Sequence, residues 1–336
     1  MPAEPLPVII DTDCGIDDAV ALWWALTDPA LEVVAVTTVW GNADVADATR
    51  NVGRVLLAAG RTDVPVAVGA SGPVAAAPEL RRADFIHGRD GLGDCGPPDS
   101  PIPPVDESAV ELLRRLTRER PGELTLLTLG PLTNVAEAIT ADDSWAGSLR
   151  DLVVMGGAAG VHGNALPAGE ANVAHDPTAA DLTVRARWRT APLLVGLDVT
   201  LVATLTDAHF ALLAEHRTPA AAFLDAPLRY YRTFGSTFTP GECPCHDLLA
   251  VMAAADPSLL TAPELPLAVQ ATPGPAWGQT VVDFRGPFFD AASGEGGDAT
   301  QPSHDGTFRS WRVALDVDVE RFRGGVDRLF GGGKPT

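Results

Sequence analysis

Two kinds of apolar pattern alternate along this chain. Short runs that are apolar almost throughout are typical of strands covered on both faces, because a half-exposed strand would alternate with polar residues. Longer segments with apolar residues every three or four positions are typical of helices. We predict strands at 8–10, 31–40, 65–69, 123–130, 151–157, 191–200, 281–284 and 311–318. We predict helices at 19–26, 43–59 and 107–119, after GPLTN (130–134), from Pro177, around His246 and Asp247, and over 320–330.

This alternation predicts an α/β fold, an open, mostly parallel (mixed) sheet flanked by helices. No internal repeat is found, and we expect one domain over residues 1–336. Stretches rich in Gly, Pro or Asp interrupt the pattern at 70–105, from 158 to about 175, and at 284–310. Loops of this length inside a domain are uncommon and are usually functional.

The net charge of the chain limits the classes of partner that it can bind. The net charge is −20, which argues against a nucleic-acid partner because phosphate binding needs clustered Lys and Arg. A small ligand that is neutral, or bridged by a cation, fits better. Residues 1–10 hold no basic residue and too short an apolar run for a signal peptide. No stretch reaches the roughly 18 apolar residues of a membrane span, so we expect a cytoplasmic protein without a membrane partner.

The cysteines do not form a metal or redox motif. Cys243 and Cys245 flank a proline, without the second pair of a zinc ribbon or the two-residue spacer of a thioredoxin-like motif. We predict reduced thiols in a packed or ligand-facing turn.

The segment VIIDTDCGIDDA (8–19) joins a buried strand to four carboxylates, Asp11, Asp13, Asp17 and Asp18. Acids this close repel one another, and a cation is the usual means of neutralising them. Oxygen ligands favour a hard cation, Ca²⁺ or Mg²⁺, over zinc or copper. The segment therefore predicts a metal site at the carboxyl end of the first strand.

Three other interpretations of the cluster lead to different chemistry. A solvated acidic turn needs no metal. A helix–loop–helix calcium loop starting at Asp11 requires Gly and Glu where this chain has Ile16 and Leu22, so that interpretation fails. A magnesium-dependent phosphatase with Asp11 as the nucleophile remains open, although Gly15 stands where such phosphatases carry Thr.

Ligands of open α/β sheets bind at the carboxyl ends of the strands, so the residues there form one candidate site. The strand ends supply the aspartate cluster and single residues from four other strands. The long loops supply one His and three residues with hydroxyl-binding chemistry. Besides the cluster, the candidates are Asn42, Leu129, Met155, Asp198, His87, Asn164, Glu170 and Asn172.

Several segments that carry these residues resemble those of a known family. The matching segments are VIIDTDCGIDDAVAL, TTVWGN, IHGRDGLGD, LGPLTN, MGGAAGVHGN, EANVAHDP, CHD, GQTVVD and VALDVDVERF. Together they are similar to the nucleoside hydrolases, specifically the calcium-dependent, inosine–uridine-preferring kind. The resemblance implies a Rossmann-like nucleoside hydrolase fold, a homodimer or homotetramer, and hydrolysis of the N-glycosidic bond of a ribonucleoside to ribose and free base.

The resemblance also implies roles for the matching residues. Ca²⁺ would be held by Asp13, Asp18, Asp247 and the backbone carbonyl of Leu129. Asp13 would act as general base on a calcium-bound water, which Asp17 and Asn42 would orient together with the ribose. His246 would donate a proton to the base, with His87 on the base side. The ribose would be bound by Asn164, Glu170, Asn172 and Met155.

The chemistry agrees with these roles. Cleavage of a ribosyl bond builds positive charge on the sugar, and an acidic pocket stabilises that charge in the transition state. His246 has an intrinsic pKa suited to protonating a poor leaving group. It therefore favours the branch of the family with a histidine acid over the purine-specific branch that relies on aromatic stacking.

Two positions depart from the family pattern. Ala171 replaces a common aromatic residue in the ribose segment, which leaves the preferred nucleoside open, and Cys14 replaces a frequent Pro. Tyr230 or Tyr231 could close over the base or pack in the core. A non-catalytic nucleoside- or ribose-binding protein is the alternative outside the enzymes.

Overall fold

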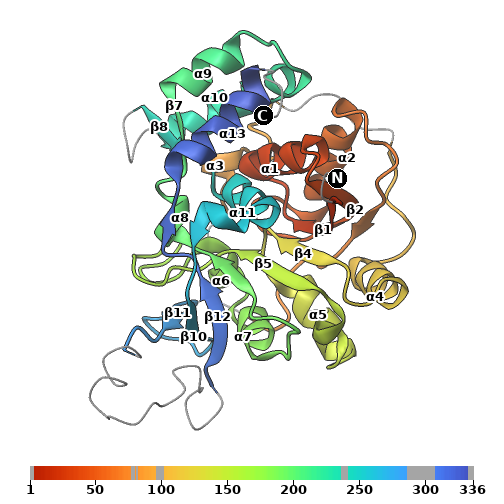
Figure 1. Ribbon diagram of the computed structural model, residues 1–336, viewed down its shortest axis with the longest axis vertical. Helices are drawn as coiled ribbons and strands as arrows, with labels where there is room; N and C mark the ends of the chain where they lie inside the picture. Colours follow the sequence, from red (N-terminus) through yellow and green to blue (C-terminus); the bar gives the residue numbers. More distant parts are fainter. Residues whose placement is uncertain are drawn as a thin grey trace.

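The computed structural model describes residues 4–76, 80, 82–95, 102–235, 241–285 and 307–331. Within this part of the chain, nine strands form one sheet (Figure 1), in the order β11-β10-β12-β6-β5-β4-β1-β2-β3. Their bounds are β1 Leu6–Thr12, β2 Leu31–Thr38, β3 Val66–Val68, β4 Thr125–Thr128, β5 Asp151–Met155, β6 Leu193–Val195, β10 Glu264–Val269, β11 Thr280–Val282 and β12 Arg309–Val313. Two small sheets pair β7 (Thr204–Thr206) with β8 (Glu242–Pro244), and β9 (Leu260–Thr261) with β13 (Asp316–Val317).

The sheet is parallel from β3 to β12. At one edge β10 runs in the opposite direction and pairs antiparallel with both β12 and β11. From β1 the chain builds outward through β2 and β3, then returns to place β4 on the other side of β1. β1 and β4 therefore flank the point where the strand order reverses. In sheets of this kind, ligands bind in the crevice at that point.

Helices cover both faces of the sheet. Val8 and Ile10 of β1 belong to one apolar cluster and Ile9 to the other, as expected for a strand buried on both sides. The helices α1, α2 and α11 lie over one face, and α4, α5 and α7 lie over the other (Figure 1). The longer helices are α1 Ile16–Thr27, α2 Val45–Ala58, α4 Ala109–Glu119, α5 Thr133–Ala141, α7 Pro177–Arg185, α9 Asp207–Ala214, α10 Pro219–Gly235, α11 His246–Ala255 and α13 Val319–Gly331. Short helices are α3 Asp84–His87, α6 Ala171–His175 and α8 Leu197–Thr200, with single turns at Trp145–Ser148 and Pro257–Leu259.

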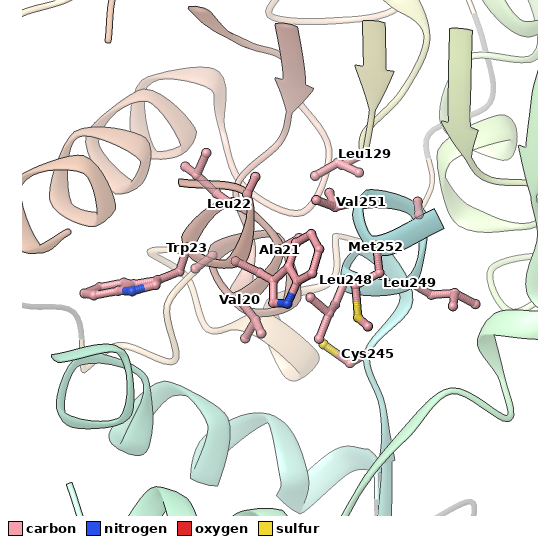
Figure 2. Close-up of a cluster of buried hydrophobic side chains, with 14 of the residues drawn as sticks. Val20, Ala21, Leu22, Trp23, Leu129, Cys245, Leu248, Leu249, Val251 and Met252 are labelled. Atoms are coloured by element: carbon pink, nitrogen blue, oxygen red, sulfur yellow. The ribbon is translucent and has the colours of Figure 1, made fainter. Parts of the chain in front are cut away.

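The helices α1 and α11 pack side by side (Figure 2). Residues 16–26 of α1 are all buried, and Leu248, Val251 and Met252 of α11 are buried with them. Burial of each such side chain is worth about 1.5–3 kcal/mol, so the two helices are held firmly. This packing brings together the first turns of both helices, which carry acidic residues.

The predicted α/β class, with its mostly parallel sheet, is confirmed, and four local predictions are wrong. The loop expected from 158 to about 175 contains the helix α6 at its end. The strand expected over 191–200 ends at Val195, because Gly196 begins the helix α8. The strand expected over 311–318 is divided between β12 and β13, which belong to different sheets. The loop over 70–105 contains α3, and its residues 77–79, 81 and 96–101 lie outside the described part. Most of the predicted loop at 284–310 also lies outside it. None of the described helices has the length and apolarity needed to cross a membrane.

Candidate active site

The aspartate cluster lies where β1 ends and α1 begins. The hydroxyl of Thr12 donates to Oδ1 of Asp18 at 2.5 Å, and the backbone N–H of Gly15 donates to Oδ2 at 2.9 Å. From the end of β2, the backbone N–H of Asn42 donates to Oδ2 of Asp13 at 2.6 Å. The Asn42 amide lies 3.3 Å from carboxylate oxygens of both Asp13 and Asp18. Two neighbouring strands therefore fix this pair of carboxylates.

Asp247, in the first turn of α11, joins the cluster from a distant part of the chain. Oxygens of Asp17, Asp18 and Asp247 lie within 4.8 Å of one another, and all three residues are buried. The carboxyl of Asp13 contacts that of Asp18. Burial, followed by the charges of neighbouring acids, raises the pKa of Asp13, Asp17 and Asp247. Four buried acids therefore lie close together, but they do not act alike, because hydrogen bonds with Asp13 and Asp247 favour the charged form of Asp18.

The cluster is suited to a hard divalent cation. Carboxylate oxygens are the ligands that Ca²⁺ and Mg²⁺ prefer, and one oxygen of Asp17 is buried without a hydrogen-bond partner in the described part of the chain. The Leu129–Gly130 segment at the end of β4 adjoins the cluster, since a Cβ added to Gly130 would lie 3.1 Å from the carboxyl carbon of Asp13. A cation would offset both the burial and the repulsion that raise the pKa values of these acids.

Two glycines allow this close packing. A Cβ at Gly41 would lie 2.0 Å from Oδ2 of Asp13, and one at Gly15 would lie 2.6 Å from Nδ1 of His87. Neither distance is compatible with a side chain, so the motif needs glycine at both positions.

His87 lies against the start of α1. Its Nδ1 accepts from the backbone N–H of Ile16 at 3.1 Å, and its ring centre is 5.4 Å from that of Tyr231. Burial, with a smaller contribution from His246, lowers the pKa of His87 to about 3. A backbone N–H can only donate, so this contact requires His87 to be neutral with its proton on Nε2.

His246 is the first residue of α11 and lies on the same side of the cluster. Its Nδ1 is 2.8 Å from the hydroxyl of Thr200, and burial lowers its pKa to about 4. Asp17 forms hydrogen bonds with the backbone N–H of His246 and with the Tyr231 side chain, whose ring also contacts His87. Both histidines are thereby linked to the acidic cluster. Tyr230 is directed elsewhere, since its hydroxyl donates to the carbonyl of Asp84 at 3.2 Å.

A second group of polar residues surrounds the start of α6. The Glu170 carboxylate accepts from the backbone N–H groups of Asn172, Gly157 and Val173 at 2.9, 2.9 and 3.1 Å, and so caps the helix. Asn172 donates through Nδ2 to the carbonyls of Leu129 at 2.7 Å and Met155 at 3.1 Å. The ends of β4 and β5 are thereby joined to α6.

Three predicted candidates lie apart from these contacts. Asn164 is exposed, and its Oδ1 accepts from the N–H of Ala171 at 2.9 Å. Asp198 lies in α8 and accepts from the N–H groups of Ala159 and Gly160, so it supports a loop. Asp11 shares the face of Ile9, because successive strand residues alternate. One of its oxygens accepts from Thr37 at 2.5 Å and Asn134 at 2.7 Å, and burial raises its pKa to about 6.

Several contributors were not identified from the sequence. Thr12 lies within the Asp-Thr-Asp motif, and Asn134 lies within the quoted GPLTN segment, so both carried a local signal. Thr200 carried none, because residue 200 was expected to end a strand. The cysteines are free as predicted, with Cys243 and Cys245 both buried.

Comparison with known proteins gives a consistent result. The family described as inosine-uridine preferring nucleoside hydrolase matches residues 8–324. Uridine nucleosidase 1 of Arabidopsis thaliana is 38% identical over 278 residues, which are 82% of this chain and 81% of that protein. The inosine-uridine preferring nucleoside hydrolase of Crithidia fasciculata is 34% identical over 324 residues, 95% of this chain and 96% of the other. A solved plant nucleoside hydrolase has a TM-score of 0.87 at 35% identity, covering 97% of this chain and 99% of that one.

The resemblance first seen in short motifs thus extends over nearly the whole sequence and the whole fold. With the acidic cluster at the carboxyl ends of β1 and β4, it establishes that this chain belongs to the inosine-uridine preferring nucleoside hydrolase family, a family of glycosidase-type hydrolases.

Proposed function

We propose that this protein hydrolyses the N-glycosidic bond of ribonucleosides to ribose and free base, with Ca²⁺ at the aspartate cluster. Family membership supports the reaction. The observation that carries it is the pairing of four closely spaced, buried carboxyls with an imidazole at the start of α11. The acids suit a sugar that becomes positively charged, and the imidazole suits a base that leaves with the bond electrons.

Asp13 is the general base in this proposal. Its Oδ2 is fixed by the N–H of Asn42 and its carboxyl contacts Asp18, so its orientation is set before substrate arrives. Asp13 takes a proton from the attacking water as the water adds to the sugar. General-base assistance is worth about 10²–10⁴-fold in rate.

The cation would be held by Asp13, Asp18, Asp247 and the carbonyl of Leu129, with Asp17 beside them. When bound, it would lower the pKa of the attacking water and offset the repulsion among the acids. One buried oxygen of Asp17 has no hydrogen-bond partner among the described residues, which supports a role for Asp17 toward water or a ribose hydroxyl.

The ribose is held between the cluster and α6. Asn42 presents its amide beside Asp13 and Asp18, while Glu170 and Asn172 lie at the start of α6, with Met155 buried beneath. Asn164 would contribute from its exposed position beside Ala171. Glu170 and Asn172 satisfy backbone groups in this structure, so hydroxyl binding must share or exchange those contacts.

His246 donates the proton to the departing base, and His87 contacts the base. The base nitrogen takes the electron pair of the broken bond together with the proton from His246. Assembly into a homodimer or homotetramer, and a cytoplasmic location, stay predictions.

The test is direct. Purified protein is incubated with uridine, inosine, cytidine and adenosine, with Ca²⁺ or with a chelator, and free base and ribose are measured. We expect release of both from at least one nucleoside, dependent on Ca²⁺. Binding of nucleosides without release would identify a binding protein instead, and phosphate release from a phosphomonoester would favour the phosphatase alternative.

A further inference from the structure

The contact between Thr200 and His246 joins two helices that are far apart in the sequence. Thr200 is the last residue of α8 and is fully buried. Its Oγ1 lies 2.8 Å from Nδ1 of His246, 46 residues further on. Among the described residues this is the one hydrogen bond found for the Thr200 hydroxyl. Buried hydroxyls are nearly always hydrogen-bonded, so the contact accounts for the placement of this polar group.

The contact occupies one of the two nitrogens of the imidazole. With Nδ1 held by Thr200, Nε2 is left as the nitrogen that can address a substrate. We propose that Thr200 is a positioning residue whose hydroxyl holds Nδ1 of His246 and thereby presents Nε2 to the departing base. This inference rests on the proposed function, in which His246 is the proton donor.

A hydroxyl is suited to this task because it can both donate and accept. When the ring is doubly protonated, Nδ1–H donates to the hydroxyl oxygen and Nε2–H faces the base. After the Nε2 proton has passed to the base, the neutral ring keeps its proton on Nδ1 and the contact is unchanged. A neutral ring that carries its proton on Nε2 instead accepts from the hydroxyl at Nδ1, so the contact persists in every protonation state once the hydroxyl hydrogen has rotated.

His87 provides the contrast. Its Nδ1 accepts from the backbone N–H of Ile16, a group that cannot accept in return. A proton on that nitrogen would break the contact. Of the two imidazoles beside the acids, only His246 can pass a proton while keeping its support. The geometry thus assigns proton donation to His246 and a fixed Nε2–H donor to His87.

The local fold keeps Thr200 in place. The backbone N–H of Thr200 donates to the carbonyl of Gly196 at 3.1 Å, and Leu197 and Val199 of the same turn are buried. Asp198 ties this turn to the loop at 159–160. The hydroxyl is therefore presented by a rigid turn.

The test compares Thr200→Val, which removes the hydroxyl at nearly constant volume, with Thr200→Ser, which keeps it. Thr183→Val is the matched control, because Thr183 is equally buried and its hydroxyl has no hydrogen-bond partner in the described structure. Uridine is one substrate, and 4-nitrophenyl ribofuranoside is the other. Nitrophenolate departs without being protonated, so its release does not need the acid.

For uridine we expect Thr200→Val to lower kcat about 10- to 100-fold, a part of the 10²–10⁴-fold that an acid provides, with KM changed less than about threefold. Thr200→Ser and Thr183→Val should stay within about threefold of the wild type. On the nitrophenyl riboside, Thr200→Val should also stay within about threefold. In a His246→Ala background, Thr200→Val should cause no further loss, because the two residues act as a unit.

Equal losses on both substrates, or additive losses with His246→Ala, would show that Thr200 merely supports the fold. Full activity of Thr200→Val on uridine would overturn the proposal as well. If the valine variant does not fold, Thr200→Ala takes its place beside Thr200→Ser.

A second readout does not depend on turnover. In protein carrying ¹⁵N-labelled histidine, with His246→Gln used for assignment, the His246 ring should show a hydrogen-bonded Nδ1 that is lost in Thr200→Val. An unchanged signal would overturn the inference. Absence of wild-type activity on every nucleoside would instead refute the proposed function and leave this measurement to decide on Thr200.

Discussion

The backbone N–H of Asn42 donates to Oδ2 of Asp13 at 2.6 Å, which fixes the acid at the end of β1 from the end of the neighbouring strand β2. Asn42 can reach Asp13 because Gly41 has no side chain. A Cβ there would lie 2.0 Å from the same oxygen. The orientation of the proposed base is thus built from the backbone, before any substrate is bound.

Gly41→Ala should therefore disable the site. The added methyl must displace the Asp13 carboxyl, and we expect activity on uridine to fall at least about 100-fold, as for loss of a general base. Gly72→Ala is the control, because a Cβ at Gly72 meets nothing within 4 Å. Steady-state kinetics of both variants check the prediction, and near-normal turnover of Gly41→Ala would show that Asp13 need not occupy its present position.

Replacement of Asp13 by Asn should reduce turnover far more than replacement of Asp11 by Asn. Asp13→Asn removes the proposed base, so turnover should fall at least about 10²-fold while the fold is kept. Asp11→Asn keeps an oxygen for the Thr37 and Asn134 contacts, and turnover should stay within about tenfold of the wild type. Steady-state kinetics of the two variants test this prediction, and thermal melting checks that both remain folded. The reverse order of effects would revive the phosphatase interpretation with Asp11 as nucleophile.

Calcium should stabilise the protein more at high pH than at low pH. The pKa of Asp17 is raised from 3.8 to about 7, by burial and then by Asp18. Between those values the cation-free folded state binds more protons than the unfolded state, so this contribution to stability is lost as the pH rises through about 7. Ca²⁺ competes with those protons, and the rise in Tm on adding it should grow between pH 5.5 and 8.

The lowered pKa values of the two histidines change stability with pH in the opposite direction, so their effect must be distinguished from that of Asp17. The pKa values of His87 and His246 are lowered from 6.5 to about 3 and about 4, so their contribution is present above pH 6.5 and is lost as the pH falls. This loss lowers the Tm with Ca²⁺ and the Tm with a chelator by about the same amount, so it cancels in the difference between the two Tm values. Melting with Ca²⁺ and with a chelator at each pH measures that difference. A calcium effect that is equal at all pH values would argue against cation binding by these acids.

Glu170→Gln should reduce stability as well as substrate binding. Three backbone N–H groups donate to the Glu170 carboxylate, and an amide would turn its own N–H toward at least one of them. We expect a loss of about 1–3 kcal/mol in the free energy of unfolding, with a higher KM for uridine.

Urea unfolding measures the effect of this change. Glu32→Gln, at a half-exposed side chain 3.7 Å from Arg120, serves as the control and should stay within about 0.5 kcal/mol. Equal stability of Glu170→Gln and the wild type would mean that Glu170 does not cap α6 in solution.

The sequence predicted the local features well because they depend on neighbouring residues. The apolar run at Val8–Ile10 indicated a strand buried on both faces, and the structure confirms it. The prediction failed where the chain changes direction within an apolar run. Gly196 converts the expected strand into the helix α8, and the antiparallel strand β10 went unpredicted because it contains Pro266, a residue that is rare inside strands.

By itself, the sequence determined the α/β class, the family, and the acids at the end of the first strand. The resemblance implied that Asp13 and Asp18 act together with Asp247, but only the tertiary structure decided which contacts hold each acid and separate Asp11 from the others. Asp11 faces Thr37 and Asn134, whereas Asp13, Asp17 and Asp18 meet Asp247 from a helix more than two hundred residues away. The support of His246 by Thr200 is likewise a contact between distant segments. Such contacts depend on strand order and helix packing, which place residues together regardless of their separation in the chain, and no local pattern contains that information.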